Sequence, residues 1–317
     1  MLELAKACLP ISHAIAGIRT ESLNNIMANI TYLGDKSIFF IIGFILYWCV
    51  SKYAGYISLL SGTASLCICV ALKDIFRIPR PFNLDPTLTI VEHPKNEVMG
   101  YSFPSGHATN IVATFGTVYL YTKNKLIKFV SILLILLICF SRIYLGAHTL
   151  LDVLVGLIIT IIILAWYYKM IKEGEKNGIN KAIIGSLLFL LVHIICVIII
   201  NVIIVSGNEI MDKVEHKTMI KMAVLLTALT LPIIIGVVLD IKYIKYDASG
   251  NVLFQVVKLI LGLSIIITYK SNSKQIFSFV TGYLSDFLQY FVMMLLGIIV
   301  CPLIFKQLKK LKVFNNN

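Results

Sequence analysis

Long apolar runs alternate with short polar segments along most of the chain. Nine such runs follow one another: Ile38–Val50, Tyr56–Leu72, Pro104–Tyr121, Leu126–Phe140, Val153–Tyr168, Ala182–Val205, Met219–Ile241, Leu253–Tyr269 and Phe279–Phe305. Most of them approach or exceed the roughly 20 residues that a helix needs to cross a bilayer. The alternation of apolar and polar residues that is typical of a membrane β-barrel is absent. The pattern predicts an all-α, polytopic membrane helical bundle with about nine transmembrane helices.

The polar segments divide the chain into three parts. Residues 1–35 mix polar and apolar positions, which predicts an N-terminal segment at the membrane interface, where Pro10 interrupts any helix. Residues 36–170 hold five spans together with the most unusual polar stretches of the chain. Residues 171–317 hold about four further spans and no recognisable motif. We therefore expect a five-span core followed by a C-terminal membrane extension.

Composition supports a membrane protein. The 317 residues are 58% hydrophobic and 14% charged, with a mean hydropathy of +0.89, which excludes an ordinary soluble domain. The seven cysteines lie mostly inside apolar runs and form no CxxC pair. They are typical of small core residues, so we expect neither a disulfide framework nor a metal cluster.

The net charge of +12 bears on orientation and not on nucleic-acid binding, because the lysines are spread over short loops between apolar runs. Nine spans would place 15 of the 28 Lys and Arg on one side of the membrane. The positive-inside rule makes that side cytoplasmic. The polar stretches, including the loop Phe82–Phe103, then face outward. We expect a multi-pass protein, of the plasma membrane, with its site on the extracytoplasmic face.

The segment from Ser141 to Asp152 places an arginine, a histidine and an aspartate at the edge of the hydrocarbon, where ionised groups are costly. Four residues separate His148 from Asp152, which on a helix puts both on one face. A carboxylate there fixes the imidazole tautomer and frees the other ring nitrogen as a nucleophile or base. Arg142 supplies a planar cation that suits phosphate. The alternative is a membrane histidine that is merely hydrogen-bonded to a neighbouring aspartate.

Three cations lie at the end of the second span. Lys73, Arg77 and Arg80 fall at i, i+4 and i+7, on one helical face if the helix continues that far. Pro79 and Pro81 make its last turn irregular. A cationic helix end that reaches lipid headgroups would explain one or two of these cations. The third, beside the Pro-x-Pro break, indicates an anion site.

The third span opens with Pro104-Ser105-Gly106-His107. A helix start offers unpaired amides and the positive end of the helix dipole, and both favour an anion. Ser105 can cap the helix or bond a phosphate oxygen, and Gly106 lets the backbone approach closely. His107 is a candidate acid for a leaving oxygen. The alternative is an N-capping serine beside an interfacial histidine.

The chain resembles the type 2 phosphatidic acid phosphatase superfamily in a three-part signature, which reads Lys73-x6-Arg80-Pro81, Pro104-Ser105-Gly106-His107 and Ser141-Arg142-x5-His148-x3-Asp152. Every motif position matches, and the combination is far more specific than any one part. The resemblance covers about Ile38–Tyr168, which makes residues 36–170 the expected phosphatase core.

The resemblance implies a role for each signature residue. His148 would form a phosphohistidine intermediate, Asp152 would orient it, and His107 would protonate the leaving group. The implied phosphate-binding residues are Lys73, Arg80, Ser105, Gly106 and Arg142. The family needs no metal or cofactor, and fixed cations and amides stabilise the transferring phosphoryl group instead. Arg77 is outside the signature, and we consider it as a contact to a second phosphate or a headgroup.

The expected substrate is a lipid phosphate or lipid diphosphate whose tail stays in the bilayer. Phosphatidic acid, phosphatidylglycerol phosphate, undecaprenyl diphosphate and sphingosine phosphate all fit, and the sequence does not choose among them. A soluble ester, as in glucose-6-phosphatase-like enzymes, is one alternative, and a transporter or flippase of phosphorylated lipid is another. In the extension we expect His193 to make an interhelical hydrogen bond and Asp240 to face the membrane interface. The extension itself would shape a lipid groove, form an oligomer interface or belong to a larger phosphatase subclass, and the oligomeric state is open.

Overall fold

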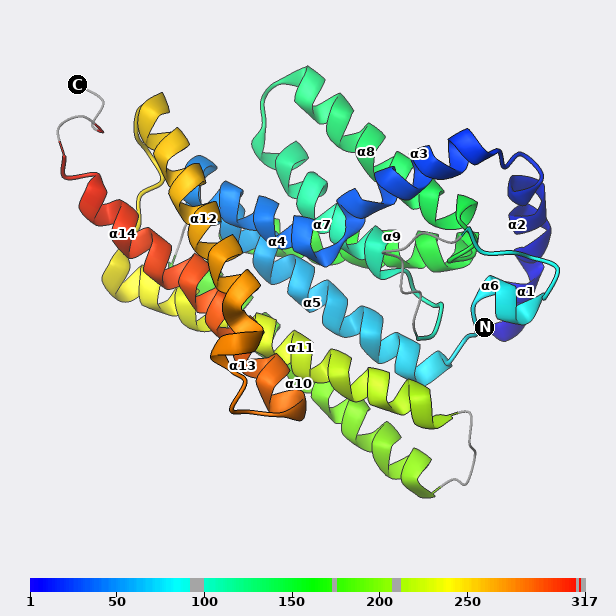
Figure 1. Ribbon diagram of the computed structural model, residues 1–317. Coiled ribbons are helices and arrows are strands. Elements are labelled where there is room, and N and C mark those ends of the chain that lie inside the picture. Colours follow the sequence, from blue (N-terminus) through cyan, green and yellow to red (C-terminus); the bar gives the residue numbers. More distant parts are fainter. Residues whose placement is uncertain (92–99, 173–175, 207–211, 312–313, 315–317) are drawn as a thin grey trace.

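The computed structural model describes residues 1–91, 100–172, 176–206, 212–311 and 314, and these residues form helices joined by short connections, with no strand (Figure 1). The elements are α1 Leu2–Ala7, α2 Leu9–Ala16, α3 Glu21–Thr31, η1 Tyr32–Gly34, α4 Lys36–Ile45, η2 Leu46–Val50, α5 Lys52–Phe76, α6 Pro81–Leu84, α7 Gly106–Tyr121, α8 Lys125–Tyr144, α9 Leu150–Ile171, α10 Lys176–Ser206, α11 Asp212–Leu239, η3 Asp240–Ile244, α12 Val252–Ile276, α13 Gly282–Leu295, η4 Leu296–Val300 and α14 Cys301–Leu308. The predicted all-α class is confirmed. Residues 92–99, 173–175 and 207–211, which belong to predicted loops, lie outside the described part.

Seven helices of the described residues are long and apolar enough to cross a membrane, or eight if the bent pair of Glu21–Gly34 and Lys36–Val50 counts as one span. The expected number of nine is therefore not confirmed. Helix α7 accounts for the difference, because its 16 residues fall short of a full span although it lies among the long helices. The other apolar runs correspond to helices that begin and end within seven residues of the predicted bounds.

Helix α5 is the centre of the bundle. It packs against α7 and α9 on one side and against α10 and α11 on the other, so it belongs to both halves of the chain (Figure 1). Small residues recur along it, among them Gly55, Ser58, Gly62 and Ser65. Side chains of this size allow the close helix contacts that hold membrane bundles together. The ring of Phe39 fills the space that a side chain at position 62 would need.

The C-terminal helices join the rest of the bundle through a buried carboxylate. Asp240 is fully buried, and the hydroxyl of Tyr56 on α5 donates a hydrogen bond to it. The backbone amide of Tyr246 donates to its Oδ1 at 2.7 Å, and Lys52 Nζ lies 3.6 Å from its Oδ2. The expectation that Asp240 faces the membrane interface is wrong, because its oxygens are used to connect α5 to the end of α11.

The second polar residue of the extension also differs from expectation. His193 on α10 is fully buried, and neither ring nitrogen has a hydrogen-bond partner. The predicted interhelical hydrogen bond is therefore wrong. One turn before His193 on α10, Leu190 packs against apolar side chains of α5 and α11.

The N-terminal residues form three short helices on the same side of the bundle as the ends of α8 and α5 (Figure 1). Pro10 stands in the first turn of α2, directly after the break at Cys8. Helices α2 and α3 pack against α8, and α1 contacts α9. The division into an interfacial segment 1–35, a core 36–170 and an extension 171–317 stays a prediction.

Candidate active site

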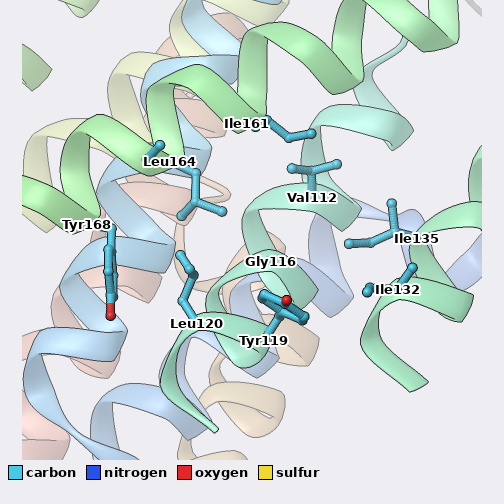
Figure 2. Close-up of a pocket in the computed structure, with 10 residues that line it drawn as sticks. Val112, Gly116, Tyr119, Leu120, Ile132, Ile135, Ile161, Leu164 and Tyr168 are labelled. Atoms are coloured by element: carbon cyan, nitrogen blue, oxygen red, sulfur yellow. The ribbon is translucent and has the colours of Figure 1, made fainter. Parts of the chain in front are cut away.

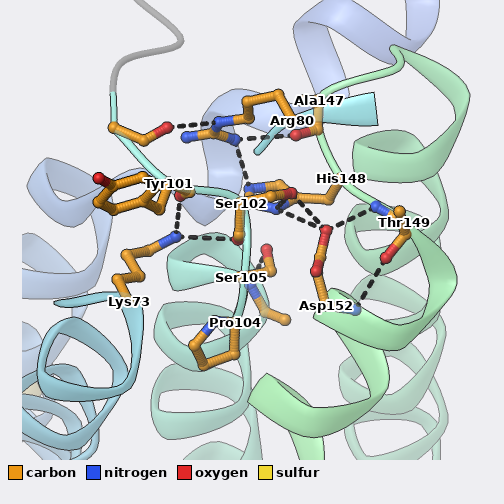
Figure 3. A network of polar contacts seen from close by, with 12 residues as sticks. Lys73, Arg80, Tyr101, Ser102, Pro104, Ser105, Ala147, His148, Thr149 and Asp152 are labelled. Carbon is orange, nitrogen blue, oxygen red and sulfur yellow. Dashed lines mark hydrogen bonds and ion pairs between the residues drawn. The ribbon is translucent and has the colours of Figure 1, made fainter. Parts of the chain in front are cut away.

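Three helix ends meet at one end of the bundle, and each carries one of the three polar stretches. They are the C-terminal end of α5, the N-terminal end of α7, and the turn between α8 and α9 (Figure 3). The side chains of Lys73, Arg80, His148 and Asp152 converge there around the segment Tyr101–Ser102. Residues that are up to 79 positions apart in sequence thus form one polar network.

His148 lies before a helix and not on one. Helix α9 begins at Leu150, with Thr149 as its N-cap, so the expected arrangement of His148 and Asp152 on one helical face is wrong. The two side chains still meet, with His148 Nδ1 3.5 Å from Asp152 Oδ2. The tight turn ahead of them requires Gly146 at φ 79°, where a side chain would be strained.

Capping explains why the contact persists without the helical spacing. The hydroxyl of Thr149 accepts a hydrogen bond from the Asp152 amide at 3.3 Å, and Asp152 Oδ2 accepts one from the Thr149 amide at 2.7 Å. This reciprocal pair is a capping box. It holds the carboxylate against the turn that carries His148, so the same bonds that start α9 also orient the histidine.

Ser102 completes this group, although the sequence did not point to it. Its Oγ donates to Asp152 Oδ2 at 2.5 Å and lies 3.4 Å from His148 Nδ1. Ser102 is fully buried, two residues ahead of the Pro104 motif, and a serine in a polar loop gives no signal of its own. Its position depends on a backbone bond in which the Ser102 amide donates to the carbonyl of Ile78 at 2.8 Å.

The cations after the second span do not share a helical face, so that expectation is wrong. Helix α5 ends at Phe76, and its C-cap Arg77 has φ 46°. Pro79 cannot continue a helix because it lacks an amide donor and restricts the residue before it. Lys73 therefore comes from the last turn of α5, whereas Arg80 comes from the following loop.

Both cations nevertheless reach the polar network. Lys73 Nζ donates to the carbonyl oxygens of Tyr101 at 2.6 Å and Ser102 at 2.9 Å. Arg80 donates to the carbonyl oxygen of Ala147 at 2.8 Å, and its Nη1 lies 3.1 Å from His148 Nε2 (Figure 3). The imidazole is thus held between a carboxylate at Nδ1 and a guanidinium at Nε2, which leaves Nε2 as the nitrogen with the lone pair.

Helix α7 begins as the sequence predicts. Ser105 is its N-cap, and the hydroxyl accepts a hydrogen bond from the Ala108 amide at 3.5 Å. The Ser105 amide donates to the carbonyl oxygen of Asp152 at 2.9 Å, which fixes the start of α7 beside α9. A Cβ at Gly106 would meet nothing within 4 Å, so the space beside this helix start is open. The positive end of the α7 dipole faces that space.

His107 and Arg142 form a second group with residues that precede α4. His107 Nε2 lies 2.9 Å from Asp35 Oδ1. Arg142 Nη1 donates to Thr31 Oγ1 at 2.9 Å. Sequence reasoning missed Asp35 because the residues before the first span carry no motif, and a lone Gly-Asp pair ahead of an apolar run is typical of a simple helix start.

Arg77, the C-cap residue of α5, contacts the backbone of its own helix. Its Nε donates to the carbonyl oxygen of Asp74 in its own helix at 3.2 Å. A role for Arg77 at a second phosphate or a headgroup stays a prediction.

The site carries positive charge beside a buried imidazole. Among the described residues, no ion pair joins Lys73 or Arg142 to a carboxylate, and the buried Nε of Arg142 has no hydrogen-bond partner. Burial lowers the pKa of His148 well below its ordinary value, and the nearby charge of Arg80 lowers this pKa further. His148 is therefore neutral at pH 7, the form in which Nε2 can attack an electrophile.

This combination suits chemistry on a phosphate. Guanidinium and ammonium groups with a helix N-terminus bind a tetrahedral oxyanion, and a neutral imidazole with an orienting carboxylate is a nucleophile. Among the described residues, no group of three or more His, Cys, Asp and Glu is arranged to hold a metal ion.

Comparison with known proteins finds relatives that are named as a phosphatase and a diphosphatase. Over 127 residues the chain is 34% identical to lipid phosphate phosphatase delta of Arabidopsis thaliana, which covers 36% of this chain and 30% of that protein. Over 164 residues it is 28% identical to undecaprenyl-diphosphatase of Sulfolobus acidocaldarius, and this match covers 51% of this chain and 75% of that protein. The crystal structure of Aquifex aeolicus LpxE matches with a TM-score of 0.45 and 26% identity, over 50% of this chain and 92% of that one. The chain thus spans under a third of the Arabidopsis protein.

Two family models match separate parts of the chain. The model of the PAP2 superfamily matches residues 54–176, which include every signature residue. The model of the PAP2 superfamily phosphatase transmembrane extension matches residues 224–312, which form the last helices. With apolar helices long enough to span a bilayer in both regions, this chain is an integral membrane protein that belongs to the PAP2 superfamily.

Proposed function

We propose that this protein is a membrane phosphatase that hydrolyses a lipid phosphate or lipid diphosphate through a phosphohistidine intermediate, without a metal ion. The observation that carries the proposal is the orientation of His148, whose Nδ1 faces Asp152 at 3.5 Å while its Nε2 faces the Arg80 guanidinium at 3.1 Å. A protein that only binds and carries phosphorylated lipid needs cations. It does not need a histidine that is oriented by a carboxylate.

In the proposed reaction, His148 Nε2 attacks phosphorus and forms a P–N bond while the P–O bond to the leaving group breaks. His107 donates a proton to the leaving oxygen. Water then attacks the phosphohistidine, His107 takes the proton of that water, and the P–N bond breaks to release inorganic phosphate. Asp152 holds Nδ1–H throughout and stabilises the positive charge that the ring acquires on attack.

The cations and the start of α7 would hold the phosphoryl oxygens. Arg80, Lys73 and Arg142 are the proposed phosphate ligands, together with the helix start at Ser105 and Gly106. Lys73 donates to two backbone carbonyls, and Arg80 donates to the carbonyl oxygens of Gly100 and Ala147 and to His148. A phosphate would replace these acceptors with charged oxygens, and such charge-assisted bonds are roughly twice as strong as neutral ones.

An apolar cavity of about 370 Å³ supports a lipid over a soluble ester. It lies between α7, α8 and α9, which each begin or end at the site (Figure 2). Its lining begins at Val112, five residues beyond His107 or about 7.5 Å along the helix, and reaches Tyr168, 16 residues beyond Asp152 or about 24 Å. A hydrocarbon tail fits there, while the phosphate occupies the polar end. The names of the relatives, lipid phosphate phosphatase delta and undecaprenyl-diphosphatase, agree with this substrate class.

We propose that the site faces the outside of the plasma membrane, because the loops on the opposite side carry more Lys and Arg. The three-part division into an interfacial segment, a phosphatase core and an extension belongs to the same proposal.

The test is release of inorganic phosphate by the purified protein in detergent with EDTA present. The substrates are phosphatidic acid, phosphatidylglycerol phosphate, undecaprenyl diphosphate, sphingosine phosphate and glucose 6-phosphate. We expect release from at least one lipid. His148→Ala should abolish this turnover because it removes the nucleophile.

The matched control is His13→Ala. His13 also contacts an aspartate, with Nε2 2.8 Å from Asp85 Oδ2, but it lies outside the site and should keep wild-type turnover. Release from glucose 6-phosphate alone would replace the lipid substrate by a soluble one. Turnover in His148→Ala equal to wild type would contradict the mechanism, and absence of release from every substrate would favour a carrier.

A further inference from the structure

Asp35 stands at the junction between η1 and α4, ahead of all three signature motifs, and its carboxylate contacts His107 at 2.9 Å. An aspartate in this position ordinarily accepts hydrogen bonds from the amides of its own first helical turn. Asp35 is the N-cap residue of α4, but its side chain makes no such bond. The carboxylate is directed to the histidine and not to its own helix.

Close packing holds the junction in this place. Asn110 Nδ2, one turn beyond His107 on α7, donates to the carbonyl oxygen of Gly34 at 3.0 Å. A Cβ at Gly34 would lie 2.9 Å from Ile138 Cγ2 and 3.1 Å from His107 Cδ2, so only glycine lets the backbone come this near. The position of Asp35 is thus fixed by α7 and α8 as well as by its own helix.

We propose that Asp35 is a positioning residue for the acid step, an inference that rests on the proposed phosphatase function. His107 must carry a positive charge before it can protonate a leaving oxygen. The charged groups that act on His107 are Arg142 on α8, Arg80 in the loop after α5, and Asp35. His148 is a further titratable group near His107. The two arginines disfavour a further positive charge, and Asp35 is the group that offsets them.

The proton balance follows from the contact. Asp35 holds Nε2–H of His107, so the proton for the leaving oxygen comes from Nδ1 as the P–O bond breaks. In the second half of the reaction, Nδ1 takes a proton from the attacking water as the P–N bond breaks. Asp35 stays ionised and touches neither phosphorus nor the leaving group. Each catalytic histidine then has its own carboxylate: Asp152 for the nucleophile and Asp35 for the acid.

The first readout is the pH dependence of turnover on the lipid that the wild-type protein hydrolyses best. Asp35→Asn keeps the size of the side chain and removes its charge. We expect kcat to fall by about tenfold or more, as part of the roughly 10²–10⁴-fold that a positioned acid contributes. KM should stay within about twofold. Without the carboxylate the imidazolium is less favoured, so the decline of kcat on the alkaline side should move to lower pH.

The second readout is the leaving group. An alkoxide needs a proton to leave, whereas 4-nitrophenolate leaves without one. Asp35→Asn and His107→Ala should therefore lose much less kcat/KM on 4-nitrophenyl phosphate than on a lipid monoester, because kcat/KM reports the steps up to cleavage of the P–O bond and not the later attack of water. A purely structural role for Asp35 would lower activity on both substrates equally.

Asp85→Asn is the matched control, because Asp85 pairs with His13 at 2.8 Å in the same way but lies outside the site. It should match wild type in both readouts. The inference would be overturned if Asp35→Asn had wild-type kinetics, or if it lost activity equally on both leaving groups with an unshifted pH profile. In either case, turnover by the unmodified protein would leave the proposed phosphatase function intact. Absence of turnover in the wild-type protein would instead remove the proposed function, and the inference with it.

Discussion

One carboxylate oxygen carries the orientation of the proposed nucleophile. Asp152 Oδ2 accepts hydrogen bonds from Ser102 Oγ and from the Thr149 amide, and it lies 3.5 Å from His148 Nδ1. Neither Ser102 nor Thr149 belongs to the signature, so the direction of the imidazole depends on two residues that the signature does not include.

Ser102→Ala should therefore lower kcat by about tenfold with little change in KM. A hydrogen bond to a charged group contributes about 1.5–3 kcal/mol, and about 1.4 kcal/mol corresponds to a factor of ten in rate. Steady-state phosphate release measures both constants. Ser65→Ala is the control, because Ser65 is also fully buried but its hydroxyl has no partner. Equal effects of the two substitutions would show that the bond to Asp152 does not matter for turnover.

Helices α7, α8 and α9 connect the polar site to the apolar cavity. Each begins or ends at the candidate site and then runs past the cavity, which Figure 2 shows. Their packing would therefore set both the proposed phosphate pocket and the proposed space for a tail. Helices α8 and α9 both pack on α7 but touch each other little, which leaves the space between them open.

Ile161→Trp should fill this cavity and discriminate between substrates by chain length. The larger side chain would displace about two methylene groups of the lipid tail from the cavity. Losing their burial costs about 1.6 kcal/mol, so KM for long-chain phosphatidic acid should rise by about tenfold. A dioctanoyl analogue should be hydrolysed with nearly unchanged KM. The measurement is KM for both lipids in mixed micelles.

The control is Ile162→Trp, because Ile162 is the next residue on α9, is exposed, and does not line the cavity. If Ile161→Trp raised KM for both lipids alike, or if the two variants behaved alike, the cavity would not be the site of the tail.

The molecule as a whole is held together by polar contacts between its two halves. Asp240 at the end of α11 accepts hydrogen bonds from Tyr56 and Tyr246, and Lys258 Nζ on α12 donates to the Trp48 carbonyl oxygen at 2.6 Å. All of these groups are buried. The extension is thus joined to α5, and through α5 to the site, by bonds that water does not weaken.

Asp240→Ala should lower the thermal unfolding temperature in detergent strongly, because it leaves buried donors without an acceptor. Removing one partner from such a buried group costs about 3–5 kcal/mol. Asp247→Ala is the control, since Asp247 pairs with Lys309 at the exposed surface and such pairs contribute about 0–1 kcal/mol. A thermal shift assay compares the two. Similar shifts would show that Asp240 does not hold the halves together.

The fold class could be predicted from the sequence to a large degree, and so could the residues of the candidate site that the structure brings together. Apolar runs of bilayer length predict helices because every backbone amide in lipid must be bonded within its own segment. Spacing of the signature residues identified Lys73, Arg80, Ser105, Arg142, His148 and Asp152, which the structure places at three adjoining helix ends. The number of spans was harder to predict, because the 16 residues of α7 are too few to cross the bilayer and its position depends on the helices packed around it.

What the tertiary structure decided is which residues meet. The sequence determined that the chain is a helical membrane protein of the PAP2 type, because hydrophobic length and motif spacing are local properties of the chain. It did not determine that α5 stops at Phe76, or that His148 is oriented from a capping turn. Nor did it reveal the contacts of Asp35 and Asp240, whose partners lie 72 and 184 residues away. Contacts over such separations follow from helix packing, and no local pattern records them.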